Sequence, residues 1–234
     1  MRPVRRIPTE VHSLALDAFG APVLRLRTPQ AWHIDPGQAV LADLGDSCGL
    51  LSPLFPCEIA PGLLSLPIEA DSTFRPGMPL SLAAPIGTGF RPPPASRRWL
   101  LASSEPVPRR LLPLLNQGIE RGVEIVFAGA QPAHSLPLSI EVVSRLDQAL
   151  AWSDYLALDT SRQALPSLLA SLAGMGIASI SLAAEILVAS DILCGWGGCG
   201  TCAVYDARGW FLACVEGPVR PLSSLLERDS RRGA

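Results

Sequence analysis

Lysine is absent from this chain of 234 residues, and every fixed positive side-chain charge belongs to arginine. This absence excludes enzymes that form a lysine Schiff base and enzymes that hold phosphate with a P-loop lysine. Charged residues are scarce, at 17% of the chain, and the formal net charge is −2. Because a nucleic-acid partner requires clustered cations to neutralise its phosphates, the composition argues against nucleic-acid binding.

The hydropathy pattern lacks both a secretory signal and a convincing membrane span. The basic segment at residues 1–8 is not followed by an apolar core. The run from Leu165 to Ala184 is uncharged over a transmembrane length, but it contains a proline, two glycines and four serines. We interpret this run as a helix over 166–173, a glycine break and a buried strand over 177–183. No membrane span is therefore expected.

Residues 1–95 are rich in proline and glycine and are broken into short apolar runs. The sequence predicts turns at Asp35-Pro-Gly37, Ala60-Pro-Gly62 and Arg75-Pro-Gly77, and strands in the runs between such turns. Several short strands at this spacing favour a small antiparallel β-barrel. The expected strands are Val11–Leu16, Val23–Arg27, Ala39–Leu44, Leu63–Ile68 and Pro79–Ala83.

Residues 96–190 follow a proline-rich linker at Arg91–Arg98 and have a different rhythm. Apolar positions repeat at helical spacing between Arg109 and Arg121, and short buried strands flank this helix. Strand–helix–strand repetition with short connections is typical of a parallel sheet, so we expect a Rossmann-like α/β domain. The expected strands are Trp99–Ser103, Val123–Ala128 and Tyr155–Leu158.

Four cysteines define the third segment, residues 191–234. Cys194, Cys199, Cys202 and Cys214 follow the spacing C-x4-C-x2-C-x11-C. This is the plant-type spacing of a [2Fe-2S] cluster, in which three thiolates come from one loop and the fourth from further along the chain. Four glycines between the first and third cysteine allow this loop to turn tightly and to aim backbone N–H groups at sulfur. The predicted fold class is therefore β + α/β: an N-terminal antiparallel β-barrel, a Rossmann-like α/β domain and a small C-terminal [2Fe-2S] module.

A zinc site is one alternative interpretation of these cysteines, and free or bridged thiols are another. Zinc sites usually combine two C-x2-C pairs or one such pair with two histidines. This chain has a single C-x2-C, and its three histidines lie far upstream. Disulfides require an oxidising compartment, whereas a cluster implies a reducing, cytoplasmic location. Cys48 and Cys57 lie outside the motif and are expected to be small buried hydrophobic side chains.

Three segments stand together in an order that is found in one known family. The cysteine loop is followed by Cys214-Val-Glu-Gly-Pro-Val219, and Pro36–Val40 and Ala84-Pro-Ile-Gly-Thr-Gly-Phe90 lie upstream. These motifs resemble the electron-transfer subunit of dihydroorotate dehydrogenase, an iron–sulfur flavoprotein of the ferredoxin–NADP reductase-like superfamily. The resemblance implies FAD in the barrel, NAD as acceptor, a hetero-oligomer with a flavin-containing catalytic subunit, and a place in pyrimidine biosynthesis.

The expected FAD site departs from the family pattern. The family holds the flavin pyrophosphate with an Arg-Pro-x-Ser-like motif, and here Pro53 aligns but Ser52 stands at the arginine and Phe55 at the serine. A charge-assisted contact to phosphate, typically about 1.5–3 kcal/mol, is therefore missing. The residues assigned to FAD from the resemblance are Pro53, Arg75, Gly87 and Gly89. Arg75 is a candidate replacement cation, but the favoured interpretation of this arginine is a solvated turn residue.

The expected NAD site departs further. A dinucleotide fold needs glycine after its first strand so that the backbone can approach a pyrophosphate. Here the turn Ala102–Pro108 has no glycine, and Glu105 brings a negative charge beside the phosphates. The sequence instead favours an ordinary connection to a helix, with Ser103 or Ser104 as N-cap and Pro106 in its first turn. NAD binding is therefore not expected.

Electron transfer through a [2Fe-2S] cluster is the leading hypothesis for the function. A non-catalytic scaffold with a structural metal and an iron–sulfur relay for an unrelated oxidoreductase remain as alternatives. Trp196 and Trp210 lie inside the cluster segment. Aromatic side chains there are expected either to shield the cluster and contact a partner or to form local core.

Overall fold

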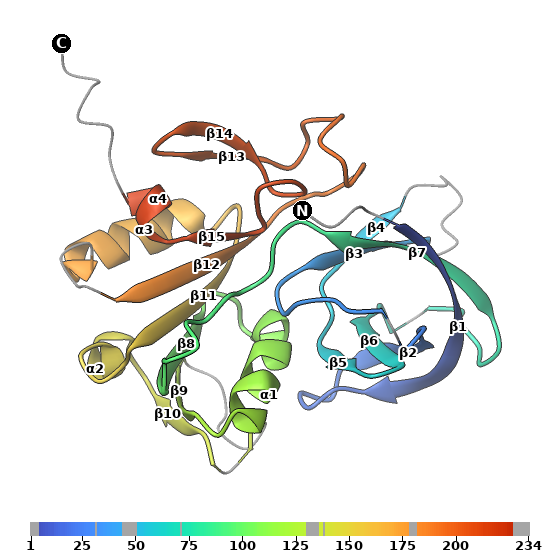
Figure 1. Ribbon diagram of the computed structural model, residues 1–234, viewed down its shortest axis with the longest axis horizontal. Coiled ribbons are helices and arrows are strands. Elements are labelled where there is room, and N and C mark those ends of the chain that lie inside the picture. The colour runs from blue at the N-terminus through green and yellow to red at the C-terminus, as the bar shows by residue number, and fades with distance from the viewer. Residues whose placement is uncertain are drawn as a thin grey trace.

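The computed structural model describes residues 5–30, 32–43, 51–70, 72–129, 136–137, 139–177 and 182–226. Within these ranges the chain forms a curled antiparallel sheet, an α/β sheet and a small C-terminal hairpin, as Figure 1 shows. The predicted fold class is confirmed.

The first sheet has the strand order β4-β3-β7-β1-β2-β6-β5, and all its described neighbours are antiparallel. The sheet is curled (Figure 1). Aliphatic side chains such as Leu24, Leu66 and Leu82 form part of its buried core. The five predicted strands are present, but β4 and β5 were missed because each has only three residues and no clear alternation. The bounds are β1 (Arg5–Leu16), β2 (Pro22–Arg27), β3 (Ala39–Ala42), β4 (Ser52–Leu54), β5 (Glu58–Ala60), β6 (Leu63–Pro67) and β7 (Pro79–Ile86).

Pro-Gly turns connect these strands where the sequence predicted them. The backbone N–H of Met78 donates to the carbonyl of Arg75 at 3.1 Å, and Gly77 between them has φ +84°. Proline followed by glycine at a positive φ is the pattern of a type II turn. The local sequence therefore decides where these strands end.

The second sheet has the order β10-β9-β8-β11-β12-β15. Its first five strands are parallel, and β15 at the edge is antiparallel to β12. The chain moves outward from β8 to β10 and then returns to the other side at β11, which is the doubly wound order of a Rossmann-like domain. The bounds are β8 (Arg98–Ser103), β9 (Glu124–Ala128), β10 (Glu141–Val143), β11 (Tyr155–Ser161), β12 (Ala183–Ala189) and β15 (Val219–Pro221).

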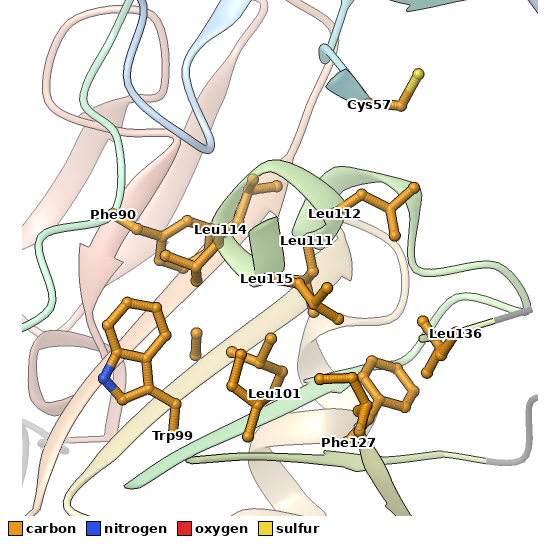
Figure 2. Close-up of a cluster of buried hydrophobic side chains, with 14 of the residues drawn as sticks. Cys57, Phe90, Trp99, Leu101, Leu111, Leu112, Leu114, Leu115, Phe127 and Leu136 are labelled. Carbon is orange, nitrogen blue, oxygen red and sulfur yellow. The ribbon is translucent and has the colours of Figure 1, made fainter. Parts of the chain in front are cut away.

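Helices cover both faces of this sheet. Helix α1 (Leu112–Glu120) lies between the sheet and the barrel, while α3 (Leu165–Gly174) lies on the opposite face with α4 (Ser223–Leu226) (Figure 1). Figure 2 shows leucines of α1 gathered over Trp99 and Leu101 of β8, with which they share one buried cluster. The barrel residues Val23 and Cys57 belong to the same cluster, so α1 joins the two sheets through apolar contact.

Two local predictions near α1 are wrong. Ser103 ends β8, and its hydroxyl donates to Asp159 at 2.9 Å instead of capping a helix. A short 3-10 turn, η1 (Arg109–Leu111), precedes α1, and Pro113 rather than Pro106 occupies the first turn of the helix. The polar network around Asp159 takes the hydroxyl that the sequence assigned to a cap.

The predicted helix in the uncharged run is present, and most of the strand predicted at 177–183 lies outside the described residues. Helix α3 covers the predicted 166–173. Residues 178–181 lie outside the described residues, and β12 begins at Ala183. Among the described residues, no helix is long and apolar enough to cross a membrane.

The C-terminal segment contributes a hairpin and the edge strand β15. The hairpin pairs β13 (Ala203–Asp206) with β14 (Gly209–Leu212). A four-residue helix, α2 (Asp147–Leu150), precedes β11 in the α/β sheet. Because β15 completes the α/β sheet beside β12, the segment that carries the cysteines is attached to that sheet by backbone hydrogen bonds.

Candidate iron–sulfur site

The four motif cysteines converge between the barrel and the C-terminal hairpin. Cys194, Cys199 and Cys202 lie on the loop between β12 and β13, and Cys214 follows β14. Cys202 and Cys214 are 1% and 2% exposed, Cys194 is half-buried and Cys199 is exposed. Barrel residues including Leu41 pack against the buried members. All four are free thiols, so the disulfide alternative does not fit.

The sulfur atoms form two pairs. Burial raises the pKa of Cys194, but hydrogen bonds from the backbone of Cys199, Trp196 and Gly198 and from the Cys199 thiol outweigh it and lower the pKa to about 6. Burial raises the pKa of Cys214 to about 12, and its hydrogen bond with the Cys202 thiol adds to the rise. Cys194 is therefore paired with Cys199, and Cys214 with Cys202.

Backbone N–H groups point at both pairs, as the glycine-rich sequence predicted. The amides of Trp196, Gly198 and Cys199 act on Cys194, and the amide of Gly197 acts on Cys214. This geometry depends on a positive φ within the loop, which is +81° at Gly195 and +87° at Gly197. Donors aimed at sulfur stabilise thiolates, and they are a standard feature of iron–sulfur sites.

The two thiol pairs match the ligand arrangement of a binuclear cluster, in which each iron takes two thiolates. A structural zinc ion needs four ligands together in a tetrahedron. Two thiol pairs with amide donors instead fit the two irons of a [2Fe-2S] cluster.

The tryptophans of the module do not form local core. Trp196 in the cysteine loop is 72% exposed and Trp210 on β14 is 69% exposed. Trp210 packs edge to face on Tyr205 of β13, with ring centroids 5.4 Å apart. Trp196 therefore exposes an aromatic ring on the cysteine loop itself, and Trp210 exposes another near the tip of the hairpin.

Gly87 and Gly89, which the resemblance assigned to FAD, lie where the barrel meets other backbone. A Cβ at Gly87 would lie 2.0 Å from the carbonyl oxygen of Gly217, and one at Gly89 would lie 2.6 Å from that of Pro36. Between them, the hydroxyl of Thr88 donates to the carbonyl of Val219 at 2.8 Å. This segment therefore attaches the cysteine module to the barrel.

A pocket of about 410 Å³ lies between β4 of the barrel and the turn after β8. Pro53 lines it, whereas Arg75 is an exposed turn residue outside its lining. Its cations are Arg109 and Arg110, which sequence analysis missed; adjacent arginines at the start of a predicted helix were the available signal. The Arg110 guanidinium lies 5.8 Å from the ring centroid of Phe55.

Carboxylates neutralise both of these arginines. Arg109 pairs with Asp17 at 2.6 Å, and Arg110 pairs with Asp159 at 2.7 Å and with Glu105 at 3.5 Å. Each guanidinium therefore already has a carboxylate partner within the protein. The pocket therefore suits an uncharged ring better than a pyrophosphate.

The turn at the expected NAD site is filled by side chains of the protein. Glu105 accepts a hydrogen bond from the backbone N–H of Ser161 at 3.0 Å. Ser104 donates to the hydroxyl of Thr160 at 2.8 Å, and Arg110 and Ser103 both donate to Asp159. These groups satisfy one another where a dinucleotide fold presents free N–H groups to phosphate. The residues present do not fit a pyrophosphate.

Cys57 is buried, at 4% exposure, as predicted. Its thiol donates to the carbonyl of Ser65 at 3.4 Å, and burial raises its pKa to about 12. Cys48 lies outside the described residues.

Comparison with known proteins agrees with the fold and the site. Residues 190–225, which include all four motif cysteines, match the family described as the iron–sulfur cluster binding domain of dihydroorotate dehydrogenase B. No curated protein matches the chain in sequence.

Solved structures with a similar fold include three reductases. An NADH-dependent reduced ferredoxin–NADP oxidoreductase has a TM-score of 0.67 and 16% identity, with 95% of this chain and 93% of the other covered. Phthalate dioxygenase reductase has a TM-score of 0.58 and 11% identity over 94% and 96%. The ferredoxin reductase of carbazole 1,9a-dioxygenase has a TM-score of 0.55 and 16% identity over 75% and 67%. At these identities the likeness establishes the fold, and the cysteine segment supplies the more specific match.

Proposed function

We propose that this chain, which joins a ferredoxin-reductase-like fold to an iron–sulfur segment of the dihydroorotate dehydrogenase B type, is an electron-transfer subunit. Its ligands for a [2Fe-2S] cluster are Cys194, Cys199, Cys202 and Cys214. Its partner is a flavin-containing catalytic subunit of the dihydroorotate dehydrogenase type. The observation that carries the proposal is the convergence of two thiol pairs and their amide donors within the matched segment.

The residues of the chain divide the site into a dry side and an accessible side. Cys202 and Cys214 are buried against the barrel, where water is excluded. Cys199 is exposed at the outer edge of the loop. When bound, a [2Fe-2S] cluster accepts and donates one electron at a time. Electrons therefore exchange with a partner through the edge that Cys199 occupies.

Exposed aromatic side chains on the cysteine loop and on the hairpin support a protein partner. Trp196 and Trp210 are mostly exposed, although large aromatic side chains are usually buried in a monomer. Trp and Tyr are enriched at the centres of protein interfaces. A catalytic subunit that covers them would bring its cofactor close to the Cys199 edge and form a hetero-oligomer.

FAD binding is proposed with low occupancy in the purified chain. The pocket beside Pro53 and Phe55 has the size and apolar lining for a ring system. The acids around Arg109 and Arg110 leave no free cation there for the diphosphate. Electrons therefore enter and leave mainly through the partner's cofactor.

A relay for a different flavoprotein is the second candidate. It is favoured by the reduced ferredoxin–NADP oxidoreductase structure, whose likeness extends over nearly the whole of both chains. A scaffold with a structural zinc ion is disfavoured by the paired thiols.

The test is electron exchange between the anaerobically purified chain and a purified catalytic subunit. Dihydroorotate should bleach the visible absorbance of the chain only when the catalytic subunit is present. The Cys199→Ser variant is the control, because its thiol pair is broken. Bleaching by another flavoprotein but not by the dihydroorotate dehydrogenase subunit would establish the second candidate, and a zinc-bound, colourless protein would overturn both.

A further inference from the structure

The hydroxyl of Thr201 is a hydrogen-bond donor to one of the cysteine ligands. Its Oγ1 donates to the Sγ of Cys199 at 3.3 Å. Both residues are exposed, and they form the outer edge of the loop. Cys199 thus receives a side-chain donor, whereas the donors to Cys194 described above come mainly from the backbone.

The carbonyl of the same threonine is held by an arginine from the α/β sheet. Nη1 of Arg162, directly after β11, donates to the Thr201 carbonyl oxygen at 3.1 Å. Across the described ranges of the chain, no carboxylate lies within ion-pair distance of Arg162. Thr201 lies next to Cys202 in the chain and two residues after Cys199. The hydrogen bond from Arg162 therefore brings a positive charge to the segment that carries both cysteines.

These contacts have a defined electrostatic consequence once thiolates bind a cluster. Four thiolates, two sulfides and two ferric ions carry a net negative charge, and reduction adds one more negative charge. A hydrogen bond to a ligand sulfur and a nearby cation both stabilise the more negative state. Both effects raise the reduction potential, which depends on hydrogen bonds to sulfur and on net charge.

We infer that Thr201 and Arg162 are positioning residues that raise the reduction potential of the cluster: Thr201 through its bond to Cys199, and Arg162 through its charge and its hold on the loop. The inference rests on the proposed function only in requiring the cluster, not the partner. In the redox step one electron enters from a donor or electrode, no covalent bond forms or breaks, and the hydroxyl proton stays on Thr201.

The experiment is a spectroelectrochemical titration of the purified full chain, with iron and sulfide measured first. Thr201→Val removes the hydroxyl at nearly constant shape, and Thr201→Ser retains it. Thr201→Val should lower the ratio of reduced to oxidised protein at a fixed poise by up to about tenfold, a shift of about 59 mV for one electron. Thr201→Ser should stay within about twofold of the wild type.

Variants of Arg162 separate charge from loop position. Arg162→Gln should lower the potential, and the difference from the wild type should shrink as salt rises from about 0.1 M to 1 M, because the Debye length falls from about 10 to 3 Å. The shift from Thr201→Val should persist in salt. Arg208→Gln is the matched control, since Arg208 is an exposed cation at the turn of the β13–β14 hairpin and its backbone N–H, not its charge, bonds Asp206. It should leave the potential unchanged.

Several outcomes would overturn the inference. A potential of Thr201→Val that coincides with that of the wild type would show that the hydroxyl has no tuning role. Loss of the cluster in both Thr201→Val and Thr201→Ala, with retention in Thr201→Ser, would assign the hydroxyl to assembly rather than to tuning. A wild-type chain without iron would overturn this inference and the proposed function together, whereas normal tuning without electron exchange with a partner would overturn the proposed function alone.

Discussion

The Nε of Arg110 donates to the carboxylate of Asp159 across 2.7 Å, and the side chain of Asp159 is only 1% exposed. Arg110 comes from the 3-10 turn before α1 and Asp159 from β11, so the pair attaches the segment after β8 to the neighbouring strand. Burial raises the pKa of Asp159, although the arginine opposes the rise. The ion pair therefore compensates for the hydration that the Asp159 carboxylate loses when it is buried.

Removing the arginine should destabilise the protein in a pH-dependent way. Arg110→Ala leaves Asp159 buried without its cation, and the expected loss is about 3 kcal/mol near neutral pH. A carboxyl whose folded pKa is raised above its unfolded value stabilises the fold below the unfolded pKa, and this stability is lost as pH rises through the folded pKa. The loss should therefore be larger at about pH 8 than at about pH 5.

Urea unfolding at both pH values measures this effect. Arg145→Ala is the control, because Arg145 forms an exposed pair with Asp147 and its removal should change stability little. Equal losses at the two pH values would contradict the assignment of the effect to the Asp159 charge.

Gly87→Ala should detach the cysteine module from the barrel. The new Cβ would lie 2.0 Å from the Gly217 carbonyl oxygen, at a φ of +73° that side chains rarely adopt. We expect a loss of about 3 kcal/mol from overpacking and backbone strain together. Gly77→Ala is the control, since Gly77 has a similar φ of +84° but open space around its Cβ position, and it should lose only about 1 kcal/mol.

Urea unfolding measures the loss of stability in Gly87→Ala. The half-life of the visible absorbance in air measures how fast the iron–sulfur cluster is lost. The cluster should be lost faster in this variant than in Gly77→Ala. Matching stabilities for the two variants would show that the contact with Gly217 is unimportant.

Anaerobic protein should contain about two irons and two sulfides per chain. Cys199→Ser should bleach the visible spectrum, because one thiol pair loses a ligand. Cys57→Ala should retain the spectrum, since Cys57 is buried in the hydrophobic core next to α1 and not in the cysteine module. Metal analysis and absorbance spectra provide the measurement, and stoichiometric zinc without iron would refute the prediction.

NADH or NADPH should not reduce the isolated chain. Glu105 and its hydrogen bond with Ser161 occupy the turn where a pyrophosphate would need free N–H groups. The measurement is the visible absorbance after anaerobic mixing, with dithionite as the control that does bleach it. Rapid bleaching by NADH alone would show that the turn rearranges to admit the nucleotide.

FAD should bind weakly and be lost on dialysis. Ser52→Arg, one residue before the pocket residue Pro53, should increase affinity by up to about tenfold if one charged hydrogen bond of about 1.4 kcal/mol is gained. Flavin fluorescence titration of both forms is the measurement. If the wild type holds one FAD tightly, Arg109→Gln tests the cation that the structure places in the pocket, and Arg75→Gln tests the one that the sequence indicated.

Local features of the sequence were enough to predict an iron–sulfur segment, the Pro-Gly turns and a barrel followed by an α/β sheet. Cysteine spacing within one loop and Pro-Gly turns such as Arg75-Pro-Gly77 depend on a few adjacent residues, so their geometry follows from local preferences. Alternating strands and helices likewise indicate a parallel sheet without knowledge of distant contacts. The predicted helix N-cap at Ser103 or Ser104 was wrong for the opposite reason. The Ser103 hydroxyl donates to Asp159, which is far away in the sequence.

Contacts between distant segments decided the rest. The attachment of Thr88 to Val219 and the hydrogen bond from Arg162 to the carbonyl of Thr201 each join residues from different elements. No periodicity or motif encodes such a contact, since each depends on how the sheets and the module pack together. The sequence by itself therefore determined which metal centre this protein is built to hold, and only the tertiary structure decided which side chains surround it and how its edge is exposed.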